Sequence, residues 1–250
     1  MSTPRIRELT VLRKHYVTEN MLRVTLGGEN MDTLPKDHEG GYVKLVFPKG
    51  DGRLMRTYTI RNQSEQELDI DFVIHGAHKE QVSGPACTWA RECIPGDKIN
   101  VGGPGPKKLV SEDADWILIA GDMTALPAIS VNIENLSNTT KGHVVIEVMS
   151  EQDIQPLTTP DGVELHWVIN PHPGKDSDFL LNKIKSLNWY EGNTAVWAAS
   201  EFSSMKKLRH FFKQEKGLDR KNMYISSYWK NGISEDEHKV VKSEDADKES

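Results

Sequence analysis

A run of six residues, Arg56–Arg61, combines groups that suit a ligand made of a flat ring and a phosphate. Arginine presents a planar fork of donors to phosphate oxygens, and a tyrosine ring can lie flat against a heterocycle. Alternate side chains share a face on a strand, so the run should present two faces. One face carries Arg56, Tyr58 and Ile60, and the other carries Thr57, Thr59 and Arg61. A flavin dinucleotide could use both faces, although tyrosine and threonine are also ordinary in any β-strand.

A second candidate segment is Gly84–Thr88, which reads Gly-Pro-Ala-Cys-Thr and is predicted to open a short helix from Pro85 to Glu92. Small residues let a ligand approach the backbone closely, and the N-terminus of a helix favours phosphate. The same residues also suit a simple turn with proline in the first helical turn. Both interpretations remain open from these residues alone.

A third candidate segment, Gly121–Pro127, follows the apolar run Trp116–Ala120, which is typical of a strand buried on both faces. In α/β folds, the loop after such a strand receives dinucleotides. The segment lacks the Gly-x-Gly-x-x-Gly fingerprint, and Asp122 or Thr124 could instead cap a helix. Its position nevertheless predicts a second nucleotide site.

The elements that must position these segments change in character along the chain. Up to Gly102–Pro106, short alternating segments separated by glycine-rich turns predict an antiparallel Greek-key β-barrel. After that predicted linker, strands alternate with helices, which predicts a doubly wound parallel-sheet α/β domain. The expected domains are residues 1–106 and 107–232, followed at 233–250 by a charged tail that is either a solvated helix or a disordered end.

The individual elements are expected at the following positions. The strands cover residues 22–26, 42–47, 68–74, 116–120, 143–149, 164–169, 194–199 and 223–227, and the helices cover 85–92, 126–136, 179–187 and 203–214.

Composition narrows the classes of function. The chain has 250 residues, 37% hydrophobic and 27% charged, as expected of a globular protein with one large or two modest domains. A net charge of −6 does not favour nucleic acid, and we expect no such partner. Cys87 and Cys93 are too few for a disulfide framework or an iron–sulfur cluster, and they fit no zinc site. The N-terminus lacks an apolar signal and no stretch approaches a membrane span, so the cytoplasm is the expected location.

Six segments, taken in order, carry a resemblance to a known family. They are Arg56–Arg61, Asp71–His75, Gly84–Ala90, Ala120–Ala128, Trp197–Glu201 and Tyr228–Gly232. Through them the chain resembles the siderophore-interacting proteins, which are FAD-dependent ferric-siderophore reductases of the ferredoxin-reductase-like superfamily. The resemblance spans nearly the whole chain and implies a flavin-binding barrel followed by a pyridine-nucleotide domain.

The resemblance implies roles for individual residues in binding FAD. Arg56 is expected to pair with the pyrophosphate, Tyr58 to pack on the isoalloxazine ring and Thr59 to bond near flavin N5. The other residues expected to border FAD are Ile60, Arg61, Asp71, Val73, His75, Gly84, Ala86, Cys87 and Thr88. The expected NADH or NADPH loop contains Gly121, Asp122, Thr124 and Ala125, and Trp229 is expected either to cover the flavin or to cap the sheet.

The substrate implied by the resemblance is a ferric siderophore. The basic side chains expected to hold it are Lys44, Lys49, Arg53 and Lys230. Electrons from NAD(P)H would pass through FAD to the iron, and Fe(II) would leave because it binds hard oxygen ligands less tightly. No nucleophile or general base is needed, so no catalytic residue is expected. His75 and His78 make a poor metal pair, and no metal site is predicted.

Two departures from the family pattern bear on the function. Ser130–Asn132 lacks an arginine often found there, so the family's siderophore preference does not carry over. Ser200 stands where the family usually has glycine, and together with the acidic tail it leaves a reduced ferredoxin that docks on the α/β domain as an alternative to NAD(P)H as the electron donor. A siderophore-binding flavoprotein without turnover and a general flavin or quinone reductase are further alternatives.

Overall fold

The structure is a computed structural model that describes residues 6–50, 52–74, 84–175 and 178–248. The chain divides into two compact units, Met1–Lys108 and Leu109–Ser250. Each unit has its own cluster of buried hydrophobic residues. Among the described residues, no helix is both long enough and apolar enough to cross a membrane.

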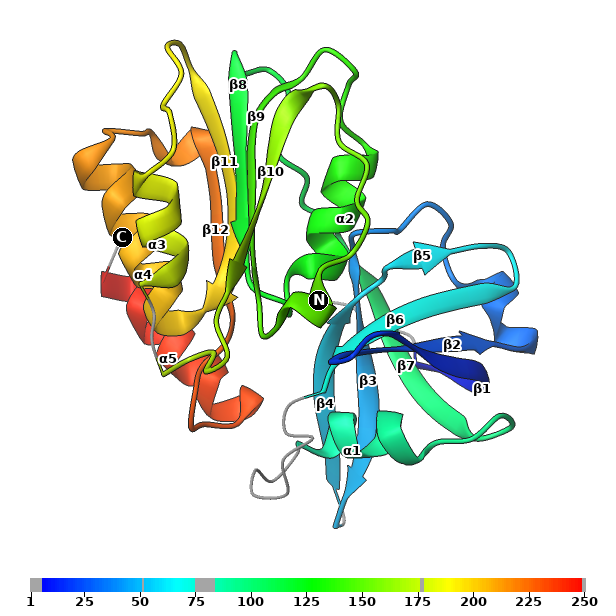
Figure 1. Ribbon diagram of the computed structural model, residues 1–250. Helices are drawn as coiled ribbons and strands as arrows, with labels where there is room; N and C mark the ends of the chain where they lie inside the picture. The colour runs from blue at the N-terminus through cyan, green and yellow to red at the C-terminus, as the bar shows by residue number, and fades with distance from the viewer. Residues whose placement is uncertain (1–5, 51, 75–83, 176–177, 249–250) are drawn as a thin grey trace. The chain divides into compact units, whose positions relative to one another are not determined.

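The first unit is built on a seven-stranded antiparallel sheet, whose curved course can be followed in Figure 1. Its strands are β1 (Ile6–Thr18), β2 (Met21–Gly27), β3 (Tyr42–Lys49), β4 (Gly52–Thr59), β5 (Asn62–Gln63), β6 (Glu67–Val73) and β7 (Lys98–Gly105). They follow the order β4-β3-β7-β1-β2-β6-β5. The sheet curls so that β4 and β6, near its opposite ends, approach each other: the Arg61 N–H just after β4 donates to the Asp69 carbonyl on β6 at 2.9 Å. A 3₁₀ turn, η1 (Glu29–Thr33), and the helix α1 (Pro85–Glu92) complete the unit.

Strand β1 was not among the expected elements, and its inward-facing residues explain why. Arg7, Leu9 and Val11 are all buried, so an arginine occupies the first position of the apolar alternation. The Arg7 guanidinium donates to the Thr33 carbonyl at 2.7 Å and to the Gly103 carbonyl at 2.7 Å. Backbone carbonyls therefore satisfy a cation that a hydropathy pattern assigns to solvent.

The predicted linker Gly102–Pro106 is wrong over most of its length, because residues up to Gly105 belong to β7. Gly102 pairs with Ile6 on β1, and Gly105 pairs with Tyr42 on β3. A Cβ atom on Gly105 would lie 2.1 Å from Cζ of Tyr42, so this glycine lets the tyrosine ring lie directly on the strand. Glycine marks a close approach of side chain and backbone here, rather than an interdomain turn.

The second unit has a parallel sheet in the order β10-β9-β8-β11-β12, with α2 on one face and α3 and α4 on the other (Figure 1). The strands are β8 (Trp116–Gly121), β9 (Lys141–Val148), β10 (Gly162–Ile169), β11 (Thr194–Glu201) and β12 (Met223–Trp229). The helices are α2 (Leu126–Glu134), α3 (Phe179–Lys185), α4 (Phe202–His210), which continues as the π-helical η3 (Phe211–Glu215), and α5 (Glu235–Lys248), with 3₁₀ turns η2 (Glu151–Asp153) and η4 (Arg220–Asn222). This sheet confirms the predicted α/β class, and the antiparallel sheet confirms the β class of the first half.

The charged C-terminal segment forms α5 and packs on β12. His238 is buried, and its Nε2 lies 2.8 Å from Oγ of Ser227. The Lys242 ammonium donates to Oγ of Ser226 at 2.8 Å and to the Ser227 carbonyl at 3.1 Å. This helix therefore belongs to the second unit, and its polar residues face β12 as well as solvent.

Candidate functional site

Tyr58 lies near the end of β4 on the face that turns toward the core of the first unit. Its ring centroid is 4.4 Å from that of Phe72, and the ring is only partly buried. Cys87 on α1 packs against the same hydrophobic core as Tyr58 and lies close enough for the tyrosine to influence the pKa of its thiol. The tyrosine is thus held from β6 and from α1 while part of its surface remains open, as an aromatic platform requires.

The start of α1 lies beside Tyr58 and has the features of a phosphate-binding turn. Gly84 precedes the helix, and a Cβ atom added to it would meet no atom of the described residues within 4 Å. The first turn contains no acidic residue, and the helix begins with Pro85. Cys87 fixes the turn, because its thiol donates to the Val73 carbonyl at 3.3 Å. Burial raises the pKa of this thiol, which favours the neutral, packing form.

Two other residues that were predicted to border FAD, Ile60 and Ala86, lie in the buried core. Ile60 is fully buried, and its N–H and C=O are bonded to Gly41 and Gly40. Ala86 is also buried in the core. These two residues belong to the hydrophobic core beneath Tyr58 and α1. The buried position of Ile60 therefore gives no support to the prediction that its side chain contacts a ligand.

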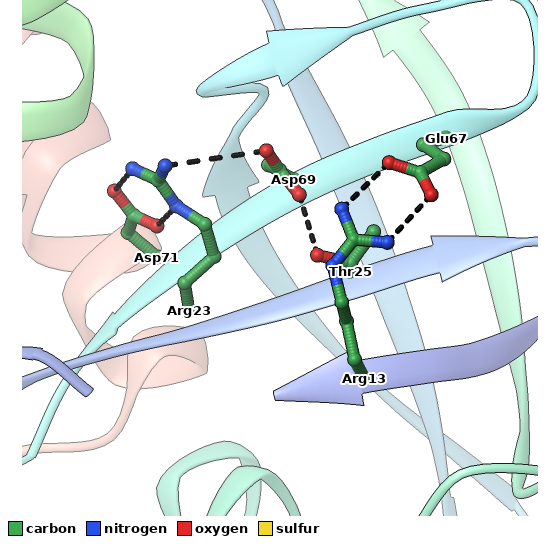
Figure 2. A network of polar contacts seen from close by, with 6 residues as sticks. All are labelled: Arg13, Arg23, Thr25, Glu67, Asp69 and Asp71. Atoms are coloured by element: carbon green, nitrogen blue, oxygen red, sulfur yellow. Dashed lines mark hydrogen bonds and ion pairs between the residues drawn. The ribbon is translucent and has the colours of Figure 1, made fainter. Parts of the chain in front are cut away.

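Asp71 belongs to a polar network on the other face of β6, shown in Figure 2. Its carboxylate accepts from Nε of Arg23 at 2.6 Å and from Nη2 at 2.8 Å. Asp69 accepts from Oγ1 of Thr25 at 2.7 Å in the same network. The side chain of Asp71 is therefore already engaged and points away from the face that carries Phe72 and Tyr58.

The basic residues predicted to hold a substrate are spread over the β3–β4 hairpin. Lys44 pairs with Thr57, and its ammonium lies 3.4 Å from Oγ1 of that residue on the exposed face. Lys49 and Arg53 lie at the far end of the hairpin, where Arg53 pairs with Pro48. Lys49 pairs with Gly52, so Lys49 and Arg53 lie at adjacent positions but point to opposite faces of the hairpin, and Lys44 lies several residues away along the strands.

In the second unit, Asp122 joins the carboxyl ends of three strands. Its Oδ1 accepts from the backbone N–H of Thr124 at 2.9 Å and from the hydroxyl of that residue. Its Oδ2 accepts from the Glu201 N–H at 2.8 Å and from the Trp229 indole N–H at 2.8 Å. Burial raises the pKa of Asp122, and these hydrogen bonds oppose the rise. Asp122 and Trp229 thus bind each other across the ends of β8 and β12.

Glu201 extends this arrangement, and sequence reasoning gave it no role of its own. Its Oε2 accepts from the N–H groups of Ser203 and Ser204, which caps α4, and its Oε1 accepts from the Asn231 N–H at 3.2 Å. The signal was present, since an acid that ends a buried strand and is followed by serines is a typical helix cap. Ser200 beside it is fully buried, so its side chain adds no bulk at the surface.

Gly121 and Ala125 are packed inside the sheet edge. A Cβ atom on Gly121 would lie 2.5 Å from the Ala199 carbonyl, and Ala125 is fully buried. Lys230 follows β12 and places its ammonium 4.7 Å from the centre of the Phe202 ring. His75, which was predicted to border FAD, lies outside the described residues, as does His78.

Two protein-family models match the chain in consecutive parts. The model "Siderophore-interacting FAD-binding domain" matches residues 10–54 and 49–108, and "Siderophore-interacting protein" matches residues 114–232. The first covers the unit that holds Tyr58 and α1, and the second covers the unit that holds Asp122.

Comparison with individual proteins agrees over nearly the full length. The chain is 32% identical to the ferric vibriobactin reductase ViuB of Vibrio cholerae, covering 92% of this chain and 91% of that protein. It is 27% identical to the NADPH-dependent ferric-chelate reductase of Escherichia coli, with 90% and 93% covered. The crystal structure of the siderophore-interacting protein SipS from Aeromonas hydrophila superimposes with a TM-score of 0.86 at 29% identity, with 98% and 99% covered.

Proposed function

Because the chain belongs to the siderophore-interacting protein family, we propose that it is a flavoprotein reductase that delivers electrons from NADPH or NADH to the ferric iron of a siderophore. The observation that carries the proposal is the meeting of Tyr58 with the uncapped start of α1, inside the part of the chain that matches a FAD-binding family model. Named relatives reduce ferric vibriobactin and ferric chelates, which supports this substrate class.

The residues present fit FAD. Tyr58 is an only partly buried aromatic ring, and among the described residues no atom would contact a Cβ atom at Gly84 beside the first turn of α1. The backbone N–H groups of that turn suit the pyrophosphate, because a helix N-terminus favours negative charge. Arg56, on the same face of β4 as Tyr58, would add a cation for the phosphates.

FAD, when bound, supplies the ability to accept two electrons as hydride and to release them singly, which ferric iron requires. The side chains of this protein orient and shield the reacting groups, with Tyr58 as the platform and Cys87 fixing the turn. Lys49, which shares the face of Tyr58 on the β3–β4 hairpin, would provide positive charge for an anionic ferric siderophore. Reduction weakens the hold of hard oxygen ligands on the iron, so the siderophore releases Fe(II).

The second unit would receive the nicotinamide nucleotide at the carboxyl ends of its strands. In such folds ligands bind at this edge, and here Thr124 and Trp229 are held there by Asp122. A reducing compartment, the cytoplasm, suits this activity, because Cys87 and Cys93 are both free thiols.

The experiment that tests the proposal is an anaerobic titration of the purified, FAD-loaded protein. We expect NADPH or NADH to bleach the flavin absorption, and a ferric siderophore to restore it while Fe(II) appears in a colorimetric chelator. A protein that does not take up FAD contradicts the proposal outright. If the flavin is reduced but ferric chelates never reoxidise it, the protein binds siderophores without reducing them. If only a reduced ferredoxin reduces the flavin, ferredoxin and not NAD(P)H is the electron donor.

Substitution of Tyr58 tests the role of the platform. Tyr58→Ala should weaken FAD binding about 10-fold, because an aromatic contact contributes roughly 0.5–1.5 kcal/mol beyond its buried area. Tyr58→Phe should keep most of the affinity, since the ring is retained. The matched control is Tyr16→Ala, because Tyr16 is an exposed tyrosine of β1 in the same unit. Equal FAD affinity in Tyr58→Ala and in the control would show that Tyr58 does not contribute to FAD binding.

A further inference from the structure

Three side chains at one edge of the parallel sheet converge on a single point. His143 lies on β9 and pairs in register with Glu164 on the edge strand β10. His166, two residues further along β10, points to the same side as Glu164. These residues lie in the second unit, in strands that the flavin and nucleotide segments do not include.

The spacing of their polar atoms matches the coordination sphere of a metal ion. Nδ1 of His143 lies 3.2 Å from Nε2 of His166 and 3.9 Å from Oε2 of Glu164, and the remaining separation is 3.7 Å. Three atoms at these distances lie on a circle with a radius of about 2.1 Å, close to the bonds of about 2.0–2.2 Å that Zn²⁺ forms with imidazole and carboxylate. An ion would need little rearrangement to reach all three.

The hydrogen bonds of His143 leave the correct nitrogen available. Its Nε2 lies 2.9 Å from the Asn188 carbonyl, which can only accept, so the neutral ring carries its hydrogen on Nε2. Nδ1 therefore carries the lone pair and accepts from the Nε2–H of His166 at 3.2 Å, and coordination of an ion by both nitrogens requires the His166 hydrogen to lie on its Nδ1 instead. Histidines that bind metals commonly donate their other N–H to a backbone carbonyl in this way.

Tyr190 orients both His143 and Glu164. The Tyr190 hydroxyl donates to Oε1 of Glu164 at 3.0 Å, which leaves Oε2 directed at the imidazoles. The Tyr190 ring also stacks on His143, with centroids 5.0 Å apart and planes 9° apart. His143 itself is buried and meets the edge of Trp116. Two of the three candidate ligands are thus preorganised by neighbours that would not bind the ion.

We propose that His143, Glu164 and His166 form a binding site for a divalent first-row transition-metal ion, with water completing the coordination on the exposed side of Glu164. Two imidazoles and one carboxylate suit Zn²⁺, Co²⁺ or Fe²⁺ and disfavour Mg²⁺ and Ca²⁺, which prefer oxygen ligands. Lys183 adds an opposing positive charge beside His166, so the affinity is expected to be lower than in a fully anionic site.

The test uses the full-length, FAD-loaded protein after treatment with a chelator. Titration with Co²⁺, followed by its d–d absorption, and with Zn²⁺, followed by calorimetry, should each show one strong site per chain. His166→Ala and Glu164→Gln should each weaken that site more than about 100-fold, because a direct ligand is lost, while circular dichroism shows that the fold is retained. The matched control is His210→Ala, because His210 is an exposed histidine of α4 in the same unit.

Tyr190→Phe separates metal binding from a purely structural role of the cluster. It keeps the ring stacked on His143 but removes the hydrogen bond to Glu164, so Co²⁺ affinity should fall about 10-fold while the Co²⁺ spectrum keeps its histidine-ligated form. Absence of a strong site in the native protein would overturn the proposal. So would unchanged Co²⁺ affinity in both His166→Ala and Glu164→Gln.

Discussion

At Asp122, one carboxylate holds together three strand ends. It accepts hydrogen bonds from Thr124, Glu201 and Trp229, and each of these partners follows or ends a different strand of the parallel sheet. A buried carboxylate is costly unless donors surround it, and here all four bonds come from N–H or O–H groups. Asp122 therefore holds Thr124, Glu201 and Trp229 in place at the sheet edge where we propose that the nicotinamide nucleotide binds.

Replacement of Asp122 by asparagine should be strongly destabilising. The amide is nearly isosteric, but its NH₂ group would face donors on one side and leave them unsatisfied. We expect Asp122→Asn to lower the free energy of unfolding by about 2–3 kcal/mol. Urea denaturation followed by tryptophan fluorescence measures this, because all tryptophans except Trp89 lie in the second unit. The exposed Asp161→Asn is the control, and equal stability of the two variants would show that the network adds little.

At the scale of elements, a predicted linker and a predicted solvated or disordered tail are both part of the packed structure. β7 carries glycines and proline yet pairs with β1 and β3, and α5 is highly charged yet places His238 and Lys242 against β12. In both cases a specific contact overrides the general preference of the residue types. For β7 the contact is the ring of Tyr42 on Gly105, and for α5 it is a pair of serines on the strand.

Gly105→Ala should destabilise the first unit by about 1–3 kcal/mol, because the new methyl group overlaps the Tyr42 ring and the ring must move. Thermal unfolding followed by circular dichroism measures the loss. Gly52→Ala is the matched control, since Gly52 also lies in a strand and its added Cβ atom would make only an ordinary contact at 3.5 Å. A double variant, Gly105→Ala with Tyr42→Ala, should recover part of the stability if the overlap is the cause.

The contact of α5 with β12 should depend on pH through His238. Burial, followed by the charge of Lys242, lowers the pKa of His238 in the folded protein, and Glu235 and Glu201 oppose this. The unfolded chain therefore takes up this proton first, near its usual pKa of about 6.5. The contribution to stability is fully present above that pH and is lost as the pH falls below it.

We expect the wild-type protein to lose more unfolding free energy between about pH 7.5 and 5.5 than His238→Gln, which keeps a polar group near Ser227. Urea denaturation at both pH values provides the comparison. His210→Gln on the exposed face of α4 is the control and should follow the wild type. Parallel pH profiles for wild type and His238→Gln would exclude a role of His238 in this dependence.

At the scale of the molecule, two units with separate cores share one chain. We expect calorimetry to resolve two unfolding transitions, one for each unit. FAD should raise the Tm of the first unit only. At about 100 times its dissociation constant, FAD should add roughly 2.7 kcal/mol, or about 10 °C in Tm for a unit of this size. Fluorescence should follow mainly the second transition, because Trp89 is the single tryptophan of the first unit. A rise of both transitions together with FAD would contradict independent units.

Prediction from the sequence was most successful where the local preference of the residue types matches the structure that they form. The run at Trp116 is apolar throughout and forms β8, and Pro85–Glu92 forms α1 as expected. Prediction was less successful where a tertiary partner reverses the local preference, as at Arg7, which faces inward because Thr33 and Gly103 satisfy it. The same limit applies to the site, since only the fold shows that Ile60 is enclosed and that Asp71 is bound to Arg23.

The central position of β1 also has a consequence for how the chain is made. β1 is synthesised before both of its neighbours, β2 and β7, and Ile6 must wait for Gly102 on β7. At about 5–20 residues per second, this interval is roughly 5–20 s. During that time β2 can shield one side of the nascent strand, while the edge that β7 will occupy stays open to other chains. Slow translation before Gly105, or crowding of nascent chains on one message, should therefore reduce the yield of this protein more than equal changes after β7 has emerged.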